Sequence, residues 1–250
     1  MFTMDSLVFL AIAVAILFAA VQRGGDGART MSERTHRVIC GAAIAAGVLV
    51  RLARLTSLPA GISAEEALVG VQAKALWQTS GFLFGQGLTT QLSQWAGETT
   101  GPLLAVMTAP FVGLLGMSKL TVRLPLALLS CAAMPAAYGL GEALSGRRAA
   151  RWMLTIAALC PIFVLEARMT CGSCAALYLL PIALCLIARG ITKPAALYPG
   201  MIVLALTAYA QDMYFFIAPA AILACAIIAL IFGRKKRHAA ISGAIGLLLC

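Results

Sequence analysis

The chain has 250 residues, of which 62% are hydrophobic and 11% are charged, and its mean hydropathy is +0.95. This much apolar surface does not fit inside one water-soluble core, so the composition excludes a soluble globular domain and predicts a protein embedded in lipid bilayer. The net charge of +10 would suggest a nucleic-acid partner in a soluble protein. Here the basic residues form short clusters between apolar runs, so we expect them to orient helices, with no nucleic acid bound.

The apolar segments predict an all-α polytopic protein, because lipid offers no partner to an unpaired backbone amide. The first segment, 7–21, lacks the basic flank of a cleaved signal peptide and is expected to be a retained span. The other segments that can cross are 38–55, 124–144, 152–165, 174–188, 197–210 and 214–232, and one more begins near Ala239. That last run stops at Cys250, short of the roughly 20 residues of a span. We therefore expect a module truncated at its C-terminus, or one part of a split system.

The distribution of basic residues decides whether the ambiguous segment 102–117 crosses. If it does not cross, 13 of the 19 basic residues share one side and six share the other. If it crosses, the strongest clusters are split between the two faces, against the rule that short basic loops stay in the cytoplasm. We therefore expect residues 1–37 to form an extra N-terminal span and a basic cytoplasmic loop. Residues 38–250 are then a transmembrane module in a cell membrane, in which 56–122 form one long exoplasmic loop carrying juxtamembrane helices.

Two adjacent acids stand near the beginning of this predicted loop. Glu65 and Glu66 follow Leu58-Pro59-Ala60-Gly61, where proline and glycine end one helix, and they precede a predicted helix over 67–77. The dipole at a helix N-terminus stabilises carboxylates. From the residues alone, a helix-start role and a catalytic role both stay open.

The order of motifs around these acids resembles the GT-C superfamily of membrane glycosyltransferases. The match is to family 39, which includes relatives of protein O-mannosyltransferases and lipid A aminoarabinose transferases, and it covers about Val48 to Phe232. It starts with an Arg-Leu pair near the end of a span, then Leu-Pro-x-Gly and the acidic pair. The further matches are Gln94-Trp95-Ala96-Gly97-Glu98, Gly101-Pro102-Leu103, Ala109-Pro110-Phe111, Leu115-Gly116, Val122-Arg123-Leu124-Pro125, Ser145-Gly146-Arg147-Arg148, Cys160-Pro161 and Glu166-Ala167-Arg168.

This resemblance implies a GT-C-like transmembrane helix bundle that transfers a sugar from a polyprenyl-phosphate donor to an exoplasmic acceptor. Glu65 and Glu66 would supply the catalytic carboxylate, with Glu65 at the position of the family's Asp. Glu98 would shape the substrate pocket. No cofactor is expected; a divalent metal is compatible with the chemistry, but no sequence feature indicates one. The lipid bilayer and a subunit supplying the missing C-terminal part are the other expected partners.

Of three further residues, Arg123 and Trp95 have two interpretations each, and Arg168 favours a site role. Arg123 is either an interfacial side chain that reaches toward water or a ligand of the donor phosphate, for which a guanidinium fork is well suited. Arg168 lies beside Glu166 at a predicted helix junction, where an unpaired charge is unfavourable, and this favours phosphate binding. Trp95 is either an interfacial aromatic or a surface on which a sugar ring stacks.

The chain also departs from the family pattern. Its acidic pair is Glu-Glu instead of Asp-Glu, Thr99-Thr100 stands where a Lys is common, and no carboxylate follows Arg168 within four residues. These departures favour an alternative, a degenerate non-catalytic homologue or subunit that binds lipid-phosphate or a partner membrane protein. A small transporter is a third class, disfavoured because the acids lie near the ends of spans instead of at mid-span.

The cysteines give no strong functional signal. Cys171 and Cys174 have the C-x-x-C spacing of a redox motif, but they lack the strand-helix context of a thioredoxin, so we expect a structural role. Five others lie inside apolar runs, where a thiol behaves as a small hydrophobe: Cys40, Cys131, Cys160, Cys185 and Cys225.

Overall fold

The computed structural model describes residues 33–57, 59–78, 102–232 and 236–250. This part of the chain is helical and contains no strand, which confirms the predicted all-α class. The α-helices are α2 (Glu33–Leu52), α3 (Ala64–Gln78), α4 (Pro102–Leu115), α5 (Lys119–Leu159), α6 (Pro161–Glu166), α7 (Gly172–Thr192), α8 (Leu197–Leu206), α9 (Asp212–Phe232) and α10 (Lys236–Leu249). Short 3-10 turns, η2 (Pro194–Ala196) and η3 (Thr207–Tyr209), flank α8. The predicted first span, 7–21, lies outside the described residues.

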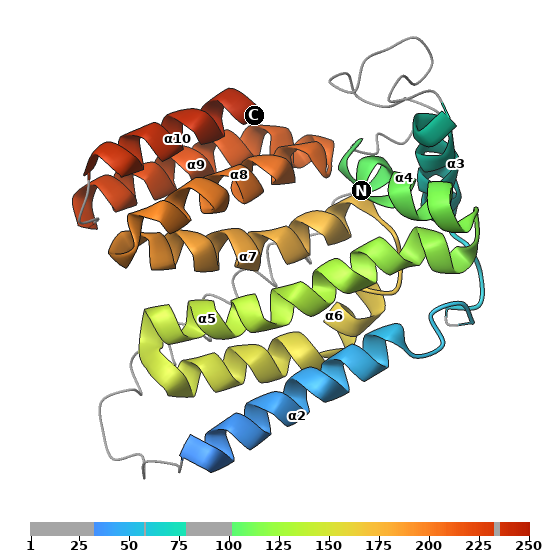
Figure 1. The fold of residues 1–250 in the computed structure, drawn as a ribbon, viewed down its shortest axis with the longest axis horizontal. Helices are drawn as coiled ribbons and strands as arrows, with labels where there is room; N and C mark the ends of the chain where they lie inside the picture. Colours follow the sequence, from blue (N-terminus) through green and yellow to red (C-terminus); the bar gives the residue numbers. More distant parts are fainter. Residues whose placement is uncertain (1–32, 58, 79–101, 233–235) are drawn as a thin grey trace.

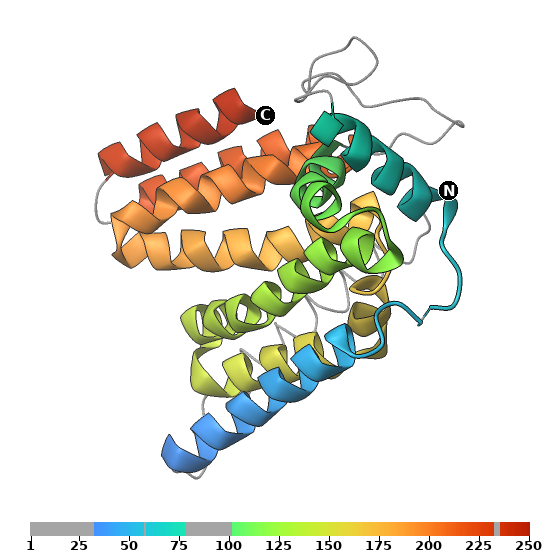
Figure 2. The same ribbon diagram turned by 45° about the vertical axis from the view of Figure 1, so that its right-hand side comes forward.

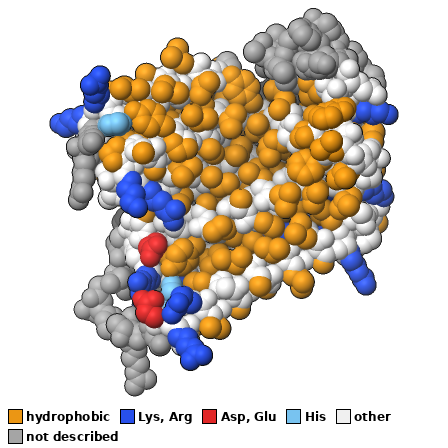
Figure 3. Space-filling view, viewed as in Figure 1, with side chains coloured by type: hydrophobic (Ala, Val, Ile, Leu, Met, Phe, Trp, Pro, Cys, Tyr) orange, Lys and Arg blue, Asp and Glu red, His pale blue; other side chains and the backbone are white. Residues whose placement is uncertain are grey.

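Three of these helices are long and apolar enough to cross a membrane: α2, α5 and α7. Shorter apolar helices occupy Pro102–Leu115, Pro194–Tyr209 and Phe216–Ile231. Large apolar side chains stand on the outer surface of the bundle, as in Leu49 on α2, Phe216 on α9 and Leu248 on α10, which are 69%, 79% and 86% exposed. Figure 3 shows hydrophobic side chains over most of one face of the molecule. A patch of this size is unfavourable in water, so the surface agrees with a membrane protein.

Helix α5 is bent back on itself. Gly146 has a φ of +79°, a left-handed conformation that a glycine adopts without steric cost, and the two arms of α5 run in opposite directions on either side of it (Figure 1). The sequence predicts two spans here, 124–144 and 152–165. The second prediction is wrong at its end, because α5 stops at Leu159. Cys160 is extended with a ψ of 124°, as expected for a residue that precedes a proline, and Pro161 then begins α6.

The helices pack side by side, with α2 against α5, α5 against α7, α7 against α8, and α10 against α8 and α9 (Figures 1 and 2). Helix α3 packs against α4 at one end of this bundle. Helix α4 has 14 residues and is about 21 Å long at 1.5 Å per residue, shorter than the roughly 30 Å of a hydrocarbon core. This length fits the predicted non-crossing segment 102–117.

The two ends of the bundle carry different groups of basic residues. The beginning of α2, the turn at Gly146, the end of α7 and the beginning of α10 lie at the left end in Figure 1, and basic side chains gather there in Figure 3. Helices α3, α4 and α6 lie at the other end. The described basic residues are therefore grouped as the charge distribution predicts. That the left end faces the cytoplasm stays a prediction.

Candidate functional site

The acidic pair lies at the beginning of helix α3, and Glu66 takes part in capping the first turn of this helix. The backbone N–H of Glu66 donates to Oγ of Ser63 at 3.1 Å, and Oε2 of Glu66 accepts from the backbone N–H of Ser63 at 3.2 Å. This reciprocal pattern is a capping box, in which two amides without helical partners are satisfied. The Ser-x-x-Glu spacing of Ser63 and Glu66 is the sequence signal for this capping box.

Glu66 also forms a buried ion pair with Arg123 at the beginning of α5. Nε of Arg123 lies 2.8 Å from Oε1 of Glu66, and Nη2 lies 2.9 Å from Oε2, so the contact is bidentate. The backbone N–H of Thr170 adds a bond to Oε1 at 3.1 Å. Glu66 is 2% exposed and Arg123 is 1% exposed. Three segments distant in sequence are therefore joined at one carboxylate.

Arg123 also binds the chain segment that leads from α2 to α3. Nη1 donates to the carbonyl oxygens of Leu55 at 3.1 Å and Pro59 at 3.0 Å, and Nη2 donates to that of Gly61 at 2.6 Å. With the two bonds to Glu66, the guanidinium donates five hydrogen bonds, which equals its number of N–H groups. The side chain therefore holds the 55–61 segment against the start of α5.

These contacts set the charge of Glu66. Burial alone would raise its pKa, but the hydrogen bond from Arg123 and those from the amides of Thr170 and Ser63 act in the opposite direction, and the net effect is a lowered pKa. Glu66 is therefore ionised at neutral pH. An ionised carboxylate that accepts bonds from this many donors is a poor general base.

Glu65 points elsewhere, as expected for consecutive residues about 100° apart on a helix. It is half-buried, and its Oε1 accepts a hydrogen bond from the backbone N–H of Gly172, at the first turn of α7, at 2.7 Å. A Cβ added to Gly172 would lie 2.5 Å from the carbonyl oxygen of Ala210, so the approach of these backbones requires glycine. Glu65 thus stands between α3 and α7.

Arg168, the other predicted phosphate ligand, binds the C-terminal end of α2. Its Nη1 donates to the carbonyl oxygen of Val50, and its Nη2 donates to those of Ala53 at 2.8 Å and Arg54 at 3.1 Å. The side chain is 7% exposed. Burial and the positive charge of Arg123 lower the pKa of Arg168. A cation at this position complements the negative end of the α2 dipole.

Arg51 is a third buried arginine of this kind. The sequence predicts no site role for Arg51, yet it is 0% exposed. Its Nη1 donates to the carbonyl oxygen of Ala158 at 2.8 Å and its Nη2 to that of Ala157 at 2.5 Å, at the C-terminal end of α5. An arginine close to the end of a predicted span is the available sequence signal, but nothing local identifies its partners.

The structure therefore brings together four of the six predicted site residues, Glu65, Glu66, Arg123 and Arg168, at one end of the bundle. Glu98 and Trp95 lie outside the described residues. Phosphate binding by Arg123 and Arg168 stays a prediction. For Arg123, whose five N–H groups all donate hydrogen bonds, it requires the exchange of a present acceptor for a phosphate oxygen.

A cavity of about 300 Å³ lies beside the ion pair. Lys119, a half-buried residue at the first turn of α5, lines it, and its Nζ donates to the carbonyl oxygen of Ala60 at 3.2 Å in a solvent-exposed hydrogen bond. The remaining walls are mainly apolar, and the lining residues are Ile62, Glu66, Ala67, Met117, Ser118, Lys119, Val122 and Arg123. The cavity thus combines an apolar wall with an accessible cation.

The predicted structural pair, Cys171 and Cys174, is joined as a disulfide beside Glu166. Because both sulfurs are bonded to each other, they offer no thiolate to a metal, and we assign no metal site among the described residues. No family model, curated protein or solved structure matches this chain.

Proposed function

We propose that this chain is the part of a membrane glycosyltransferase that carries the acidic pair. The enzyme moves a sugar from a polyprenyl-phosphate donor to an acceptor hydroxyl on the exoplasmic side. The observation that carries the proposal is the division of the acidic pair. Glu66 is buried and bound by Arg123, whereas Glu65 is half-buried at the junction of α3 and α7. One carboxylate fixes the helix start, and its neighbour is presented to a substrate.

In this mechanism Glu65 is the base or the group that orients the acceptor. The acceptor oxygen forms a bond to the sugar's anomeric carbon, the bond from that carbon to the phosphate oxygen breaks, and the acceptor proton passes to Glu65. A carboxylate accepts up to about four hydrogen bonds, so its bond to Gly172 is compatible with an acceptor hydroxyl as a further partner. The phosphate leaves as an anion and needs less acid assistance than an alkoxide.

The leaving phosphate requires a cation, and Lys119 is the best placed of the described residues. Its hydrogen bond to Ala60 is exposed to solvent, it lines the cavity beside Glu66, and an ammonium has three N–H donors, of which one binds Ala60. Arg123 and Arg168 then act mainly by positioning, because their N–H groups bind main-chain carbonyls. The apolar wall of the cavity suits the first isoprene units of the donor.

The test compares carboxylate variants of the complete protein in membranes, with labelled polyprenyl-phosphate sugars as donors. Glu65→Gln should lower turnover on the order of 10² to 10⁴-fold and leave donor binding nearly unchanged, because general bases act in the transition state. Glu65→Asp should keep activity. Glu142→Gln, a change to an exposed acid on α5, is the matched control. Normal transfer by Glu65→Gln would rule out the carboxylate mechanism.

A second candidate function is binding of lipid-phosphate or a partner membrane protein without catalysis. The observation in its favour is that Arg51, Arg123 and Arg168 all use their guanidinium groups on main-chain carbonyls, as structural residues do. Binding of a polyprenyl-phosphate sugar without transfer to any acceptor, combined with equal binding by Glu65→Gln, would favour this function over glycosyl transfer.

A further inference from the structure

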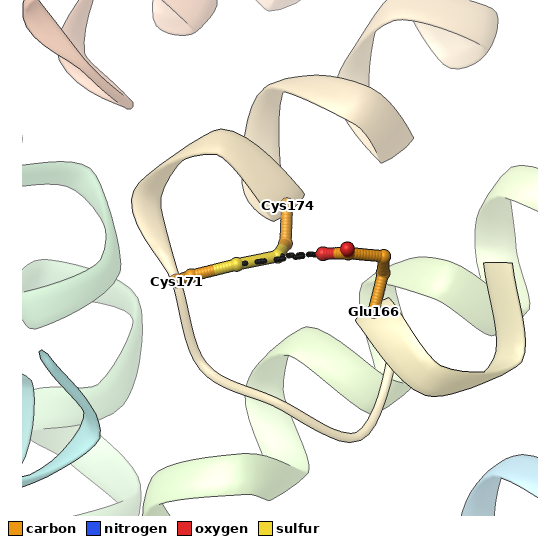
Figure 4. Close-up of side chains that lie close together, drawn as sticks. All are labelled: Glu166, Cys171 and Cys174. Atoms are coloured by element: carbon orange, nitrogen blue, oxygen red, sulfur yellow. Dashed lines mark hydrogen bonds between the residues drawn. A yellow bond between two sulfur atoms is a disulfide. The ribbon is translucent and has the colours of Figure 1, made fainter. Parts of the chain in front are cut away.

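The beginning of α7 carries two cysteines that the proposed sugar transfer does not use. Cys171 is the residue that precedes the helix, Cys174 lies in its first turn, and the two sulfurs form a disulfide. Glu166, at the end of α6, points at the sulfur pair (Figure 4). Its Oε2 lies 2.6 Å from Sγ of Cys174 and 3.6 Å from Sγ of Cys171.

The two sulfurs differ in access. Cys174 is 1% exposed, whereas Cys171 is half-buried. Oγ of Ser173 donates to Sγ of Cys171 at 3.7 Å, and the N-terminal dipole of the 21-residue helix α7 also favours negative charge at this sulfur. An accessible sulfur with a stabilised thiolate and a buried sulfur beside a carboxyl group is the asymmetry that thiol–disulfide exchange requires.

We propose that Cys171, Cys174 and Glu166 form a thiol–disulfide exchange site that reacts with an external thiol. The thiolate of the co-reactant attacks Sγ of Cys171, a mixed disulfide forms, and the bond to Sγ of Cys174 breaks. The Cys174 thiolate takes the proton of the Glu166 carboxyl. A second thiolate then attacks the co-reactant's sulfur and releases Cys171. In sum, one protein disulfide and two thiols give one protein dithiol and one external disulfide, so atoms and electrons balance.

Two properties of the site fit this role better than a purely structural one. A disulfide between residues three apart closes a very short loop, and the stabilisation from loop closure grows with loop length, so this bond adds little to the fold. Burial also raises the pKa of Glu166, which favours the protonated carboxyl that the first step consumes. The exchange reaction itself does not require glycosyl transfer.

The first experiment equilibrates the purified full chain with mixtures of reduced and oxidised glutathione and counts free thiols by maleimide gel shift. We expect two thiols to appear together in one two-electron transition, located by mass spectrometry at Cys171 and Cys174. A pair that stays oxidised even in fully reduced glutathione would identify a structural disulfide and overturn the proposal. A pair that stays reduced and retains stoichiometric zinc would overturn it as well.

The second experiment measures the rate of reduction by glutathione. Glu166→Gln should slow it by on the order of tenfold to a hundredfold, because the leaving Cys174 loses its proton donor. Glu142→Gln, a change to an exposed acid close to the bend of α5 at Gly146, should leave the rate unchanged. An unchanged rate in Glu166→Gln would remove Glu166 from the site.

The third experiment tests which sulfur is attacked. Cys174→Ser should trap glutathione on Cys171 as a stable mixed disulfide, whereas Cys171→Ser should trap little on the buried Cys174. Fragmentation of the peptide from Met169 to Arg189 in the mass spectrometer locates the added glutathione and distinguishes it from modification at Cys185. Equal trapping in both variants would contradict the assigned direction of attack.

Discussion

Replacing Arg123 by alanine is the sharpest test of how the site is held. The substitution removes both bonds to Glu66 and leaves that carboxylate 2% exposed without its counter-ion. It also removes the donors to the carbonyl oxygens of Leu55, Pro59 and Gly61. We therefore expect the connection between α2 and α3 to loosen, and the start of α3 with it.

Breaking a buried ion pair by removing one partner costs about 3–5 kcal/mol, because the other charge stays buried. For a chain of this size, about 1 kcal/mol lowers the melting temperature by roughly 2–4 °C, so Arg123→Ala should lower it by about 6–20 °C. Thermal unfolding of the detergent-solubilised protein, followed by intrinsic fluorescence, measures this shift. The double variant Arg123→Ala, Glu66→Ala should be no less stable than Arg123→Ala, because it removes the uncompensated carboxylate.

The chain supplies a matched control in its second described ion pair, between Arg147 and Glu33. Their side chains are 61% and 60% exposed, and solvent screens such a pair strongly. Arg147→Ala should leave the melting temperature almost unchanged. Equal shifts in melting temperature for Arg123→Ala and Arg147→Ala would refute the reasoning. It would also be refuted if the double variant at Arg123 and Glu66 lost as much stability as the two single variants together.

Three further predictions concern pH, packing and orientation. Because the pKa of Glu66 is lowered in the folded protein, its stabilisation is fully present above the usual pKa of a glutamate and is lost as the pH falls from there through the lowered pKa of the folded state. A pH series of melting temperatures should show this dependence weakened in Glu66→Gln. A Cβ on Gly47 would lie within 3.0 Å of α5 side chains, whereas a Cβ on Gly41 would meet nothing within 4 Å. Gly47→Leu should therefore destabilise the protein by about 1–3 kcal/mol, and Gly41→Leu should leave its stability unchanged, as measured by the same melting curves. A cysteine placed at Lys74 should react with an impermeant maleimide from outside and one at Arg148 only from inside, and the reverse pattern would contradict the orientation.

The helical class and most boundaries follow from local sequence because lipid restricts the choices. The predicted segment 174–188 corresponds to α7, Gly172–Thr192, and the predicted segment 38–55 corresponds to α2, Glu33–Leu52. The error at 152–165 has a local cause, since Pro161 stops α5, and hydropathy alone is insensitive to it. The bend at Gly146 is likewise a property of one backbone angle and not of composition.

The candidate site was only partly predictable, for a different reason. The position of Glu65 and Glu66 at a helix start can be derived from proline, glycine and the capping spacing. The different environments of the two carboxylates depend on partners distant in the chain. Arg123 lies 57 residues from Glu66, and Gly172 lies 107 residues from Glu65. No short motif encodes such pairings, so Arg123 could be recognised as important from sequence but not assigned its carbonyl partners.

The buried pair of Arg123 and Glu66 contributes something that apolar packing would not. A hydrophobic pair of the same volume is often as stable as a buried ion pair, because removing charges from water is unfavourable. A bidentate contact, however, fixes direction as well as distance. With Glu66 held by Arg123 and by the amides of Ser63 and Thr170, the first turn of α3 has one orientation, and Glu65, about 100° further around the helix, has only one direction in which to project. We infer that the pair serves to aim Glu65 at the start of α7, as a preorganised carboxylate requires.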